Sequence, residues 1–369
     1  MVDCTVLPAN LLRPAFFFYN KGNNTIGGMN MLTIGYIGNG KSTNRYHLPF
    51  SMNRDHLKVK AIYARNPDKS EWEKAPGVLY TNDIDAIMND PEIQLIVVCT
   101  HIDSHYAYAK MALDHGKHVL VEKPFMLTTD EAVSIFQYAK EKKLIIQCYQ
   151  NRRYDSDFLT TQKVIESGKL GELLEVEFNY DYYRPETPLS VTQFSKFNSY
   201  LYGHGVHTVD QAISYFGAPE SINYDVRQLL GPGRMNDYFD LDFFYPSLKV
   251  SIKSSFFRLK ARPSFAVYGK KGVFVKETID RQEEHLKLFY LPKGHADFGI
   301  DLPEHYGIVT YLDDEGKYHE EKVVSEKGDY ARVYDDMYQT IVHGKEKVIK
   351  DEETVAVMRI LEKGIEGCS

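Results

Sequence analysis

The chain has 369 residues, of which 43% are hydrophobic and 26% are charged, and its formal net charge is −7. This length suits two domains better than one core, and the composition is that of a globular protein. A modest acidic excess excludes a general electrostatic attraction to nucleic acid or to an anionic membrane, and no apolar run approaches the roughly 20 residues of a transmembrane helix.

Residues 1–30 are predicted to form an N-terminal extension outside the fold. Their apolar runs do not have the order of a signal peptide, because Arg13 lies among them and no small-residue cleavage site follows. The cysteines form no CxxC pair, and Cys99 and Cys148 lie in apolar runs where reduced, buried thiols are expected. These features predict a cytoplasmic protein whose partner is a small molecule, with no nucleic acid or membrane involved.

From Leu32 onward, short apolar strands alternate with helices. Strands are predicted over residues 32–38, 59–64, 95–100, 118–122 and 144–149, and helices over residues 42–52, 84–88, 104–115 and 129–142. The run 95–100 carries almost no polar residue, as expected for a strand that is covered on both faces. The alternation predicts a doubly wound parallel sheet, the Rossmann type of α/β domain, over residues 31–151.

After about residue 152 the pattern changes to aromatic-rich runs that alternate in polarity. A helix is predicted over residues 158–167, strands over 175–183, 240–245, 249–257, 265–268 and 272–276, and helices over 330–342 and 351–363. Such runs, divided by turn residues, predict a mostly antiparallel sheet. Residues 152–369 are therefore expected to form an α+β domain with C-terminal helices.

A glycine-rich turn follows the first predicted strand. Gly38 and Gly40 fill the first two positions of the GxGxxG fingerprint, with Asn39 between them, and Thr43 stands at the third position. Glycine lets a phosphate approach the backbone closely, and the following helix N-terminus offers free N–H groups to the anion. The turn is predicted to bind a dinucleotide phosphate, and an ordinary structural turn is the alternative.

The end of the second predicted strand bears on the choice of dinucleotide. An NAD site usually places an acid there to hold the ribose 2′-hydroxyl, but this chain has Ala64-Arg65-Asn66. An arginine suits a 2′-phosphate, and Lys41 and Ser42 can contribute from the glycine turn. NADP(H) is therefore preferred over NAD(H), and the competing interpretation is a solvated arginine on a loop.

The strand predicted over residues 118–122 ends in Glu122-Lys123-Pro124. Ligands of open α/β sheets lie at the carboxyl ends of the strands, and Pro124 is compatible with a cis peptide bond there. A lysine desolvated beside a cationic nicotinamide has a lowered pKa, so Lys123 is a candidate to take a proton from a substrate hydroxyl as hydride leaves. Taken alone, a lysine after a strand is more readily interpreted as a surface charge.

Together these motifs resemble the Gfo/Idh/MocA family, the relatives of glucose–fructose oxidoreductase and inositol dehydrogenase. The resemblance runs from about residue 32 to the C-terminus and is strongest to the branch of NADP-dependent scyllo-inositol dehydrogenases. It is carried by the glycine turn, Thr100, His105 and residues 116–124, 149–153, 183–185, 205–210, 268–272 and 274–276.

The resemblance implies a Rossmann domain paired with an open-faced sheet domain, with substrate between them. It implies that Lys123 assists proton transfer, that His207 contacts the reacting hydroxyl or carbonyl, and that the open sheet face forms a homodimer or homotetramer interface. Metal is not expected, because nicotinamide supplies the hydride. The cofactor set is Gly38, Asn39, Gly40, Lys41, Ser42, Thr43, Arg65, Thr100, His101, His105, Glu122, Lys123 and Arg152. The candidate substrate contacts are Tyr183, Tyr202, His204 and Asp210.

Two departures from the family pattern leave the function open. Gly203 stands where inositol dehydrogenase-like members carry an aspartate, four residues before the histidine, and His101 follows Thr100 where a proline is usual. The first interpretation is an NAD(P)-dependent oxidoreductase, acting on a secondary alcohol or ketone of an inositol, polyol or sugar. The alternatives are a catalytically inactive dinucleotide-binding sensor and an enzyme that eliminates water from a sugar in the same fold.

Overall fold

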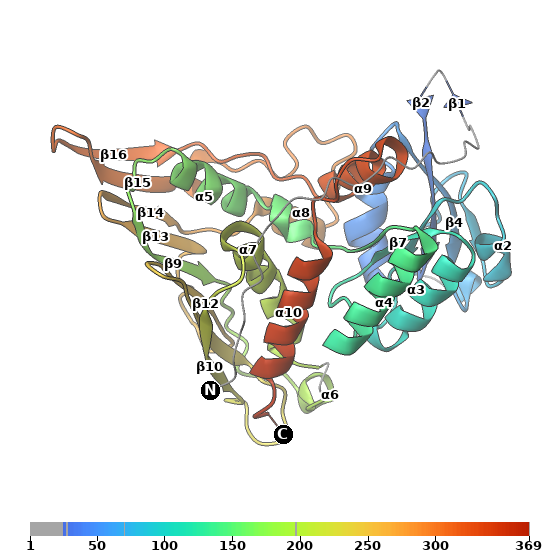
Figure 1. The fold of residues 1–369 in the computed structure, drawn as a ribbon, viewed down its shortest axis with the longest axis horizontal. Coiled ribbons are helices and arrows are strands. Elements are labelled where there is room, and N and C mark those ends of the chain that lie inside the picture. The colour runs from blue at the N-terminus through green and yellow to red at the C-terminus, as the bar shows by residue number, and fades with distance from the viewer. Residues whose placement is uncertain (1–24, 27–28, 70, 196–197, 369) are drawn as a thin grey trace.

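The computed structural model describes residues 25–26, 29–69, 71–195 and 198–368. Two units lie side by side, each built on its own sheet (Figure 1). Most of the predicted N-terminal extension lies outside the described residues. Its described part forms a small antiparallel pair, β1 (Thr25–Ile26) and β2 (Met29–Asn30).

The first unit is a six-stranded parallel sheet in the order β5-β4-β3-β6-β7-β8. Its strands β3, β6, β7 and β8 are buried on both faces because helices cover them, which confirms the predicted doubly wound sheet. The strands are β3 (Leu32–Ile37), β4 (Leu57–Tyr63), β5 (Leu79–Thr81), β6 (Leu95–Val98), β7 (His118–Val121) and β8 (Ile146–Cys148). The helices are a π-helical turn η1 (Thr43–His47), α1 (Leu48–Ser51), η2 (Pro67–Lys69), α2 (Asp85–Met88), η3 (Ile102–Ser104), α3 (His105–Asp114) and α4 (Thr129–Lys142).

The carboxyl ends of the central strands meet at one edge of this sheet. Backbone bonds continue the pairing past the strands: Gly38 N–H donates to the Tyr63 carbonyl at 2.9 Å, and Glu122 N–H donates to the Val98 carbonyl at 2.9 Å. The glycine turn, the end of β4 and the turn after β7 are therefore held close together, where a ligand of a doubly wound sheet lies.

The second unit is an eight-stranded sheet in the order β10-β11-β12-β9-β13-β14-β15-β16. Its pairings are antiparallel except that of β12 with β9, as the sequence predicted. The strands are β9 (Leu173–Asn179), β10 (Ser221–Arg227), β11 (Tyr238–Phe244), β12 (Lys249–Ser255), β13 (Phe265–Gly269), β14 (Gly272–Lys276), β15 (Gly307–Leu312) and β16 (Tyr318–Val323).

Helices cover one face of the second sheet. Figure 1 shows α5 (Ser156–Glu166), α7 (Val206–Phe216) and α10 (Asp351–Gly364) on that face. The shorter elements of this half are η4 (Asn151–Tyr154), α6 (Leu189–Thr192), a π-helical turn η5 (Leu201–Gly205), α8 (Arg281–Lys287) and η6 (Pro303–His305). Two of them, η4 and η5, lead into α5 and α7 and bring their residues toward the first unit.

Helix α9 (Arg332–His343) packs in the core of the first sheet, although the sequence analysis assigned residues 152–369 to the second domain. Val333, Tyr334 and Met337 are fully buried among β3, β4 and β6 side chains. The Tyr334 hydroxyl lies 2.9 Å from the Tyr36 hydroxyl on β3. This late helix therefore completes the core of the early sheet.

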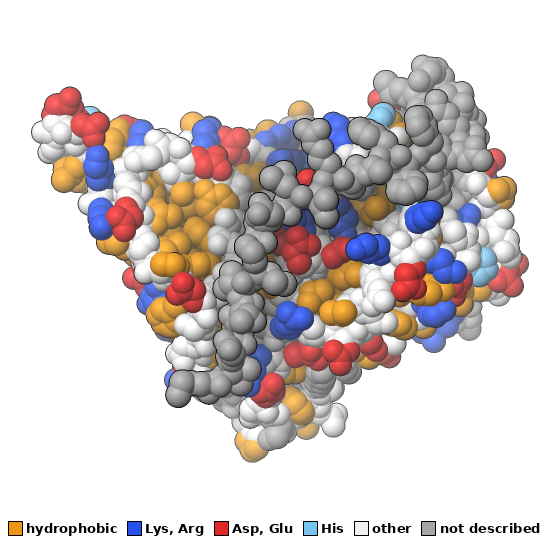
Figure 2. Space-filling view, viewed as in Figure 1, with side chains coloured by type: hydrophobic (Ala, Val, Ile, Leu, Met, Phe, Trp, Pro, Cys, Tyr) orange, Lys and Arg blue, Asp and Glu red, His pale blue; other side chains and the backbone are white. Residues whose placement is uncertain are grey.

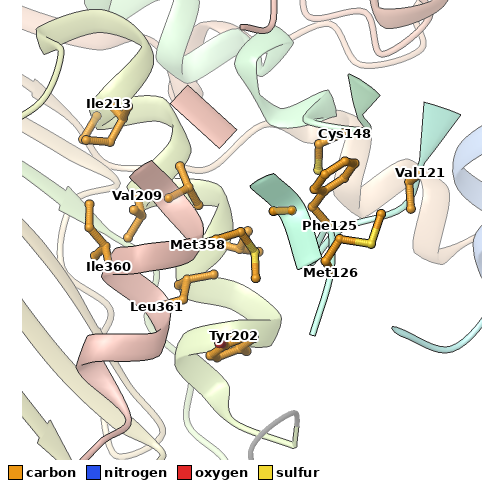
Figure 3. Close-up of a cluster of buried hydrophobic side chains, with 14 of the residues drawn as sticks. Val121, Phe125, Met126, Cys148, Tyr202, Val209, Ile213, Met358, Ile360 and Leu361 are labelled. Atoms are coloured by element: carbon orange, nitrogen blue, oxygen red, sulfur yellow. The ribbon is translucent and has the colours of Figure 1, made fainter. Parts of the chain in front are cut away.

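A buried hydrophobic cluster joins the two units. Figure 3 shows Phe125 and Met126, from the segment after β7, facing Met358 of α10 across the boundary. Tyr202 and Leu361 lie in the same cluster on the second unit's side. Burying these side chains together fixes how the turn after β7 sits against α7 and α10.

The charged side chains on the surface agree with the modest net charge of the chain. On the face drawn in Figure 2, Lys and Arg side chains are interspersed with Asp and Glu, and neither sign dominates. Among the described helices, none is both long enough and apolar enough to cross a membrane.

Candidate active site

The glycine turn closes tightly against β6. Gly38 has φ of 110°, and a Cβ atom there would lie 2.4 Å from the Cys99 carbonyl oxygen, so only glycine fits. Thr43, at the third fingerprint position, is buried and donates its hydroxyl to the Gly38 carbonyl at 2.8 Å. A Cβ atom on Gly40 would meet no other described atom within 4 Å, which leaves that side of the turn open to a ligand.

A cleft of about 810 Å³ runs from this turn along the carboxyl ends of β4 and β6. Its volume lies in the range of ligand sites, and the open glycine turn fits a dinucleotide phosphate. The predicted residues that line it are Gly38, Asn39, Arg65, Thr100 and His101. Glu71, Trp72 and Tyr108 also line it, and the sequence analysis did not identify them.

His105 was predicted to bind the cofactor, but the structure gives its ring other contacts. Its Nε2 lies 3.1 Å from the Thr100 carbonyl, and its Nδ1 lies 3.1 Å from the Pro124 and Phe125 carbonyls. The ring is buried and lines neither this cleft nor the neighbouring cavity. It ties the end of β6 to the turn after β7, and so it positions Thr100.

A second cavity of about 350 Å³ lies between the two units and adjoins the cleft at Thr100. The predicted residues that line it are Lys41, Ser42, Thr100, Glu122, Lys123, Arg152, His204 and His207. It is also lined by Tyr149, Asn151, Tyr180, Tyr182 and Gly203, and by Tyr46 and Glu283, which the sequence analysis did not identify. The strand-end lysine and the histidine of α7, 84 positions apart in the numbering of the chain, thus share one site.

Lys123 is partly buried and lines this cavity, and the peptide bond to Pro124 is cis, as the sequence allowed. Its Nζ donates to the Gly203 carbonyl at 3.1 Å. Burial lowers the pKa of Lys123, and the neighbouring Glu122 carboxylate acts in the opposite direction. The lysine is therefore biased toward the neutral form that can accept a proton.

Glu122 is held ionised beside it. His47 Nε2 lies 3.0 Å from the carboxylate, Ser42 donates its hydroxyl to it, and the Lys123 backbone N–H donates at 2.8 Å. Burial alone raises the pKa of Glu122, but these partners and the Lys123 charge outweigh it and hold the pKa at about 2. His47 also bonds to Tyr334 through Nδ1 at 2.5 Å, so this chain of contacts runs from the glycine turn to α9.

Two histidines enter the cavity from η5 and α7. Burial, with the charge of Lys123 next in importance, holds the pKa of His207 well below its usual range, and the same holds for His204. Both rings are therefore neutral. His204 packs against Tyr200 with ring centroids 4.6 Å apart, whereas no described side chain hydrogen-bonds His207 Nδ1.

Arg152 is fixed by three acceptors in the wall of the cavity. It donates to Asp155 at 3.0 Å and to the Tyr180 hydroxyl at 2.8 Å, and its Nη2 lies 3.0 Å from Glu283. Glu283 in turn accepts from the Tyr46 hydroxyl at 3.0 Å. Because Arg152 and Glu283 are paired with each other, the hydroxyl and amide groups of the cavity wall are the groups that remain to contact a substrate.

The predicted substrate contacts divide between the cavity and other places. His204 lines the cavity, whereas Tyr202 lies in the buried cluster between the units (Figure 3). Tyr183 is 56% exposed beside Phe257. Asp210 accepts two hydrogen bonds of 2.7 Å from Arg153, whose positive charge compensates this buried carboxylate. Asp210 lines neither cavity.

Two family models cover almost the whole described chain. One, described as the oxidoreductase family with an NAD-binding Rossmann fold, matches residues 32–150, and one for the C-terminal alpha/beta domain of the same family matches residues 162–369. The chain belongs to the Gfo/Idh/MocA family of oxidoreductases. The predicted family, fold class and general enzyme class are thereby confirmed.

Relatives within this family agree along the full length. The uncharacterized oxidoreductase YhhX of Escherichia coli is 46% identical and covers 92% of this chain and 97% of its own length. A crystal structure of yhhX superposes with a TM-score of 0.87 at 45% identity, covering 92% of this chain and 98% of that one. The scyllo-inositol 2-dehydrogenase (NADP(+)) IolW of Bacillus subtilis is 29% identical, over 91% of this chain and 93% of its own.

In this Gfo/Idh/MocA member, a main-chain group stands where the resemblance led us to expect a carboxylate. Gly203 offers its backbone carbonyl to Lys123, and no other described atom lies within 4 Å of the position a Cβ would take. Lys123 therefore has a neutral acceptor in place of an anionic one, which leaves burial as the main influence on its pKa.

Arg152 and Glu283, in the wall of the cavity, are paired with each other. Across the described ranges, no cluster of three or more His, Cys, Asp or Glu side chains is arranged to hold a metal ion. The prediction that the site works without a metal stays a prediction.

Proposed function

We propose that the protein is an NADP(H)-dependent dehydrogenase or reductase that acts on a secondary alcohol, or the matching ketone, of an inositol, polyol or sugar. The observation that carries this proposal is that Lys123 and His207, both with lowered pKa values, line one cavity directly beside the glycine-turn cleft. Thr100 lines both the cleft and the cavity, which supports a bound dinucleotide whose reacting end lies next to both side chains.

The roles of the side chains follow from their charge states. When bound in the cleft, nicotinamide supplies the group that accepts or donates hydride. Neutral Lys123 takes the proton of the substrate hydroxyl during oxidation, and protonated Lys123 returns it during reduction. His207 lines the same cavity and contacts the reacting oxygen, and Glu122, ionised and held by His47 and Ser42, offsets the charge that Lys123 gains.

The lining of the cavity suits a polyhydroxylated and uncharged substrate. Tyr46, Tyr180 and Tyr182 present hydroxyl groups, and Asn151 presents an amide. Each hydroxyl both donates and accepts hydrogen bonds, which matches the alternating needs of a polyol ring. The similarity to IolW, whose name gives scyllo-inositol as its substrate, supports this class.

The proposal is tested by a panel of inositols, inososes, sugars and polyols with NADP(H) and NAD(H), followed through the near-ultraviolet absorbance of the reduced cofactor. Lys123→Met is expected to lower kcat by roughly 10²- to 10⁴-fold, the usual contribution of a proton-transfer group. Lys140→Met, on the exposed side of α4, is the matched control and should leave turnover unchanged. Unchanged turnover in Lys123→Met contradicts the assigned role.

The cofactor preference rests on two opposite charges in the cleft. Arg65 favours a 2′-phosphate, whereas Glu71 lines the same cleft and disfavours it. We expect Arg65→Ala to weaken binding of NADP(H) more than that of NAD(H), and Glu71→Gln to strengthen NADP(H) selectively, by calorimetric titration of both cofactors. Equal affinity of the unaltered protein for both cofactors contradicts the preference.

A sensor without turnover is the second candidate function. Gly203, which provides a carbonyl in place of a carboxylate beside Lys123, is the observation that favours it. Tight NADPH binding without conversion of any panel substrate supports the sensor. Conversion of a sugar to its dehydrated product, with no net change in the cofactor, supports elimination of water.

We also propose that two or four copies associate through the face of the large sheet opposite the helices. Side chains alternate along a strand, so the neighbours of buried Val267 and Val309 face away from α5 and α7. Tyr268 and Ile308 are such neighbours, 38% and 41% exposed. Exposed apolar side chains on a sheet face are typical of an interface.

A further inference from the structure

The ring of His207 borders two cavities. It lines the substrate cavity, and it also lines a small internal cavity of about 10 Å³, enclosed by residues of η4, α5, α7, β9 and β13. Arg152 and Tyr180 border both cavities as well. The smaller volume is about what one water molecule needs.

Two polar atoms on the wall residues of the small cavity lack a protein partner. Within the described chain, His207 Nδ1 and Asn179 Oδ1 are buried and make no hydrogen bond. The amide nitrogen of Asn179 is already committed, since it donates to the Pro263 carbonyl at 2.9 Å and to Glu177 at 3.3 Å. Its Oδ1 can therefore only accept, and a buried acceptor is normally satisfied by protein or by ordered water.

A third polar group borders the same cavity. Asp157 lines this cavity, and its Oδ1 accepts the backbone N–H of Phe158 at 2.9 Å. Burial and the neighbouring Asp280 carboxylate raise the pKa of Asp157, against the opposing charges of Lys276 and Arg152. The carboxyl group is thereby biased toward its protonated form, which can donate a hydrogen bond.

We propose that a single buried water bridges His207 Nδ1 and Asn179 Oδ1 and fixes His207 in the tautomer that carries its hydrogen on Nε2. One water O–H goes to Asn179, which can only accept, and the other goes to His207 Nδ1. The water lone pairs face Asp157, which donates to them. Asn179 is then a positioning residue: it acts on the reaction through the water and the imidazole.

The tautomer of His207 matters because Lys123 and His207 have different roles at the reacting oxygen of the substrate. This step rests on the proposed function. Lys123 takes the substrate hydroxyl proton during oxidation, so His207 must offer a donor to the oxygen lone pair and not a second acceptor. The Nε2–H tautomer provides that donor in both directions of the reaction, because a ketone oxygen also accepts.

The experiment reads the tautomer and the water in the ligand-free protein. Histidine-specific ¹⁵N NMR, with the His207 signals assigned by their loss in His207→Gln, is expected to show the Nε2–H form. A high-resolution crystal structure is expected to show water density within hydrogen-bond distance of His207 Nδ1 and Asn179 Oδ1. The Nδ1–H form, or the absence of that density, overturns the proposal.

A variant series then separates positioning from simple stability. Asn179→Leu removes the acceptor and the room for water, so both tautomers are expected, with kcat lowered at least about tenfold and the affinity for cofactor unchanged. Asn179→Asp keeps an acceptor oxygen and should restore the single tautomer, and Asn223→Ala on exposed β10 is the control. A single Nε2–H tautomer in folded Asn179→Leu overturns the role of Asn179.

The test of the buried water and of the His207 tautomer does not depend on whether turnover is found. Absence of turnover on the whole panel defeats the proposed dehydrogenase, whereas the NMR and crystallographic readouts still decide the water and the tautomer. If Asn179→Leu does not fold, the measurements on the unaltered protein remain decisive.

Discussion

Gly203 controls the charge next to Lys123, the residue that we propose transfers the proton. Its carbonyl accepts from Lys123 Nζ at 3.1 Å, and a side chain added there meets open space. Gly203→Asp is expected to place an anion beside Lys123 and raise the pKa of its side chain. Since oxidation requires neutral lysine, the rising limb of its pH–rate profile should move to higher pH.

The matched control for this prediction is Gly203→Asn, which has the same shape without the charge. Its pH–rate profile should keep the midpoint of the unaltered enzyme, whatever happens to its maximal rate. A Gly203→Asp profile that overlays the Gly203→Asn profile contradicts the proton-transfer role given to Lys123.

Residues that follow the end of a predicted element could be placed in the site from sequence, and distant partners could not. Lys123 was found because it ends a buried strand before a proline, and Gly38 because it ends another. Glu283 belongs to the short helix α8, far along the chain, and its contact with Arg152 has no local signal. The link from His47 to Glu122 likewise depends on folding two distant turns together.

At the scale of elements, the helix over residues 129–142 was predicted with its observed ends. Thr128 caps it by accepting the backbone N–H of Glu131 at 3.1 Å, a short-range signal that sequence shows directly. The single helix expected over residues 42–52 is instead η1 followed by α1, where Pro49 lacks an N–H for helical bonding. Strands β10 and β16, the two edges of the large sheet, were missed because their side chains are polar or half exposed. Strands β5 and β15 were missed as well.

The contact chain from η1 through the turn after β7 to α9 makes stability depend on Glu122. The folded pKa of about 2 lies below the ordinary value of 4.5, so the carboxylate stabilises the fold above pH 4.5. That contribution is lost as the pH falls from about 4.5 to about 2. Glu122→Gln should therefore be less stable than the unaltered protein at neutral pH, with the difference shrinking over this acid range.

Urea unfolding midpoints measured from pH 2.5 to pH 7, about the range in which this carboxylate titrates, check that expectation. Glu141→Gln, on the exposed side of α4, should show little difference from the unaltered protein at any pH. A stability difference for Glu122→Gln that stays constant with pH is the contrary result.

For the whole molecule, the open face of the large sheet carries the expectation of self-association. Ile308→Glu puts a charge on this face, on β15, and should dissociate the assembly to monomers in sedimentation velocity, with the fold intact by circular dichroism. Leu79→Glu, at an exposed position on β5 of the other sheet, should leave the assembly as it is. A monomeric unaltered protein, or an assembly indifferent to Ile308→Glu, refutes the proposed interface.

The position of α9 in the sequence also affects the order in which the two units can fold during translation. The early sheet draws Val333, Tyr334 and Met337 from a helix near the other terminus, and Tyr334 bonds both to Tyr36 and to His47. A nascent chain on the ribosome therefore exposes one flank of its dinucleotide domain until nearly all of the second domain has emerged. Cofactor binding and the final packing of this core are thus delayed until late in translation. A chain truncated before α9 would have an incompletely packed first core, which chaperones bind.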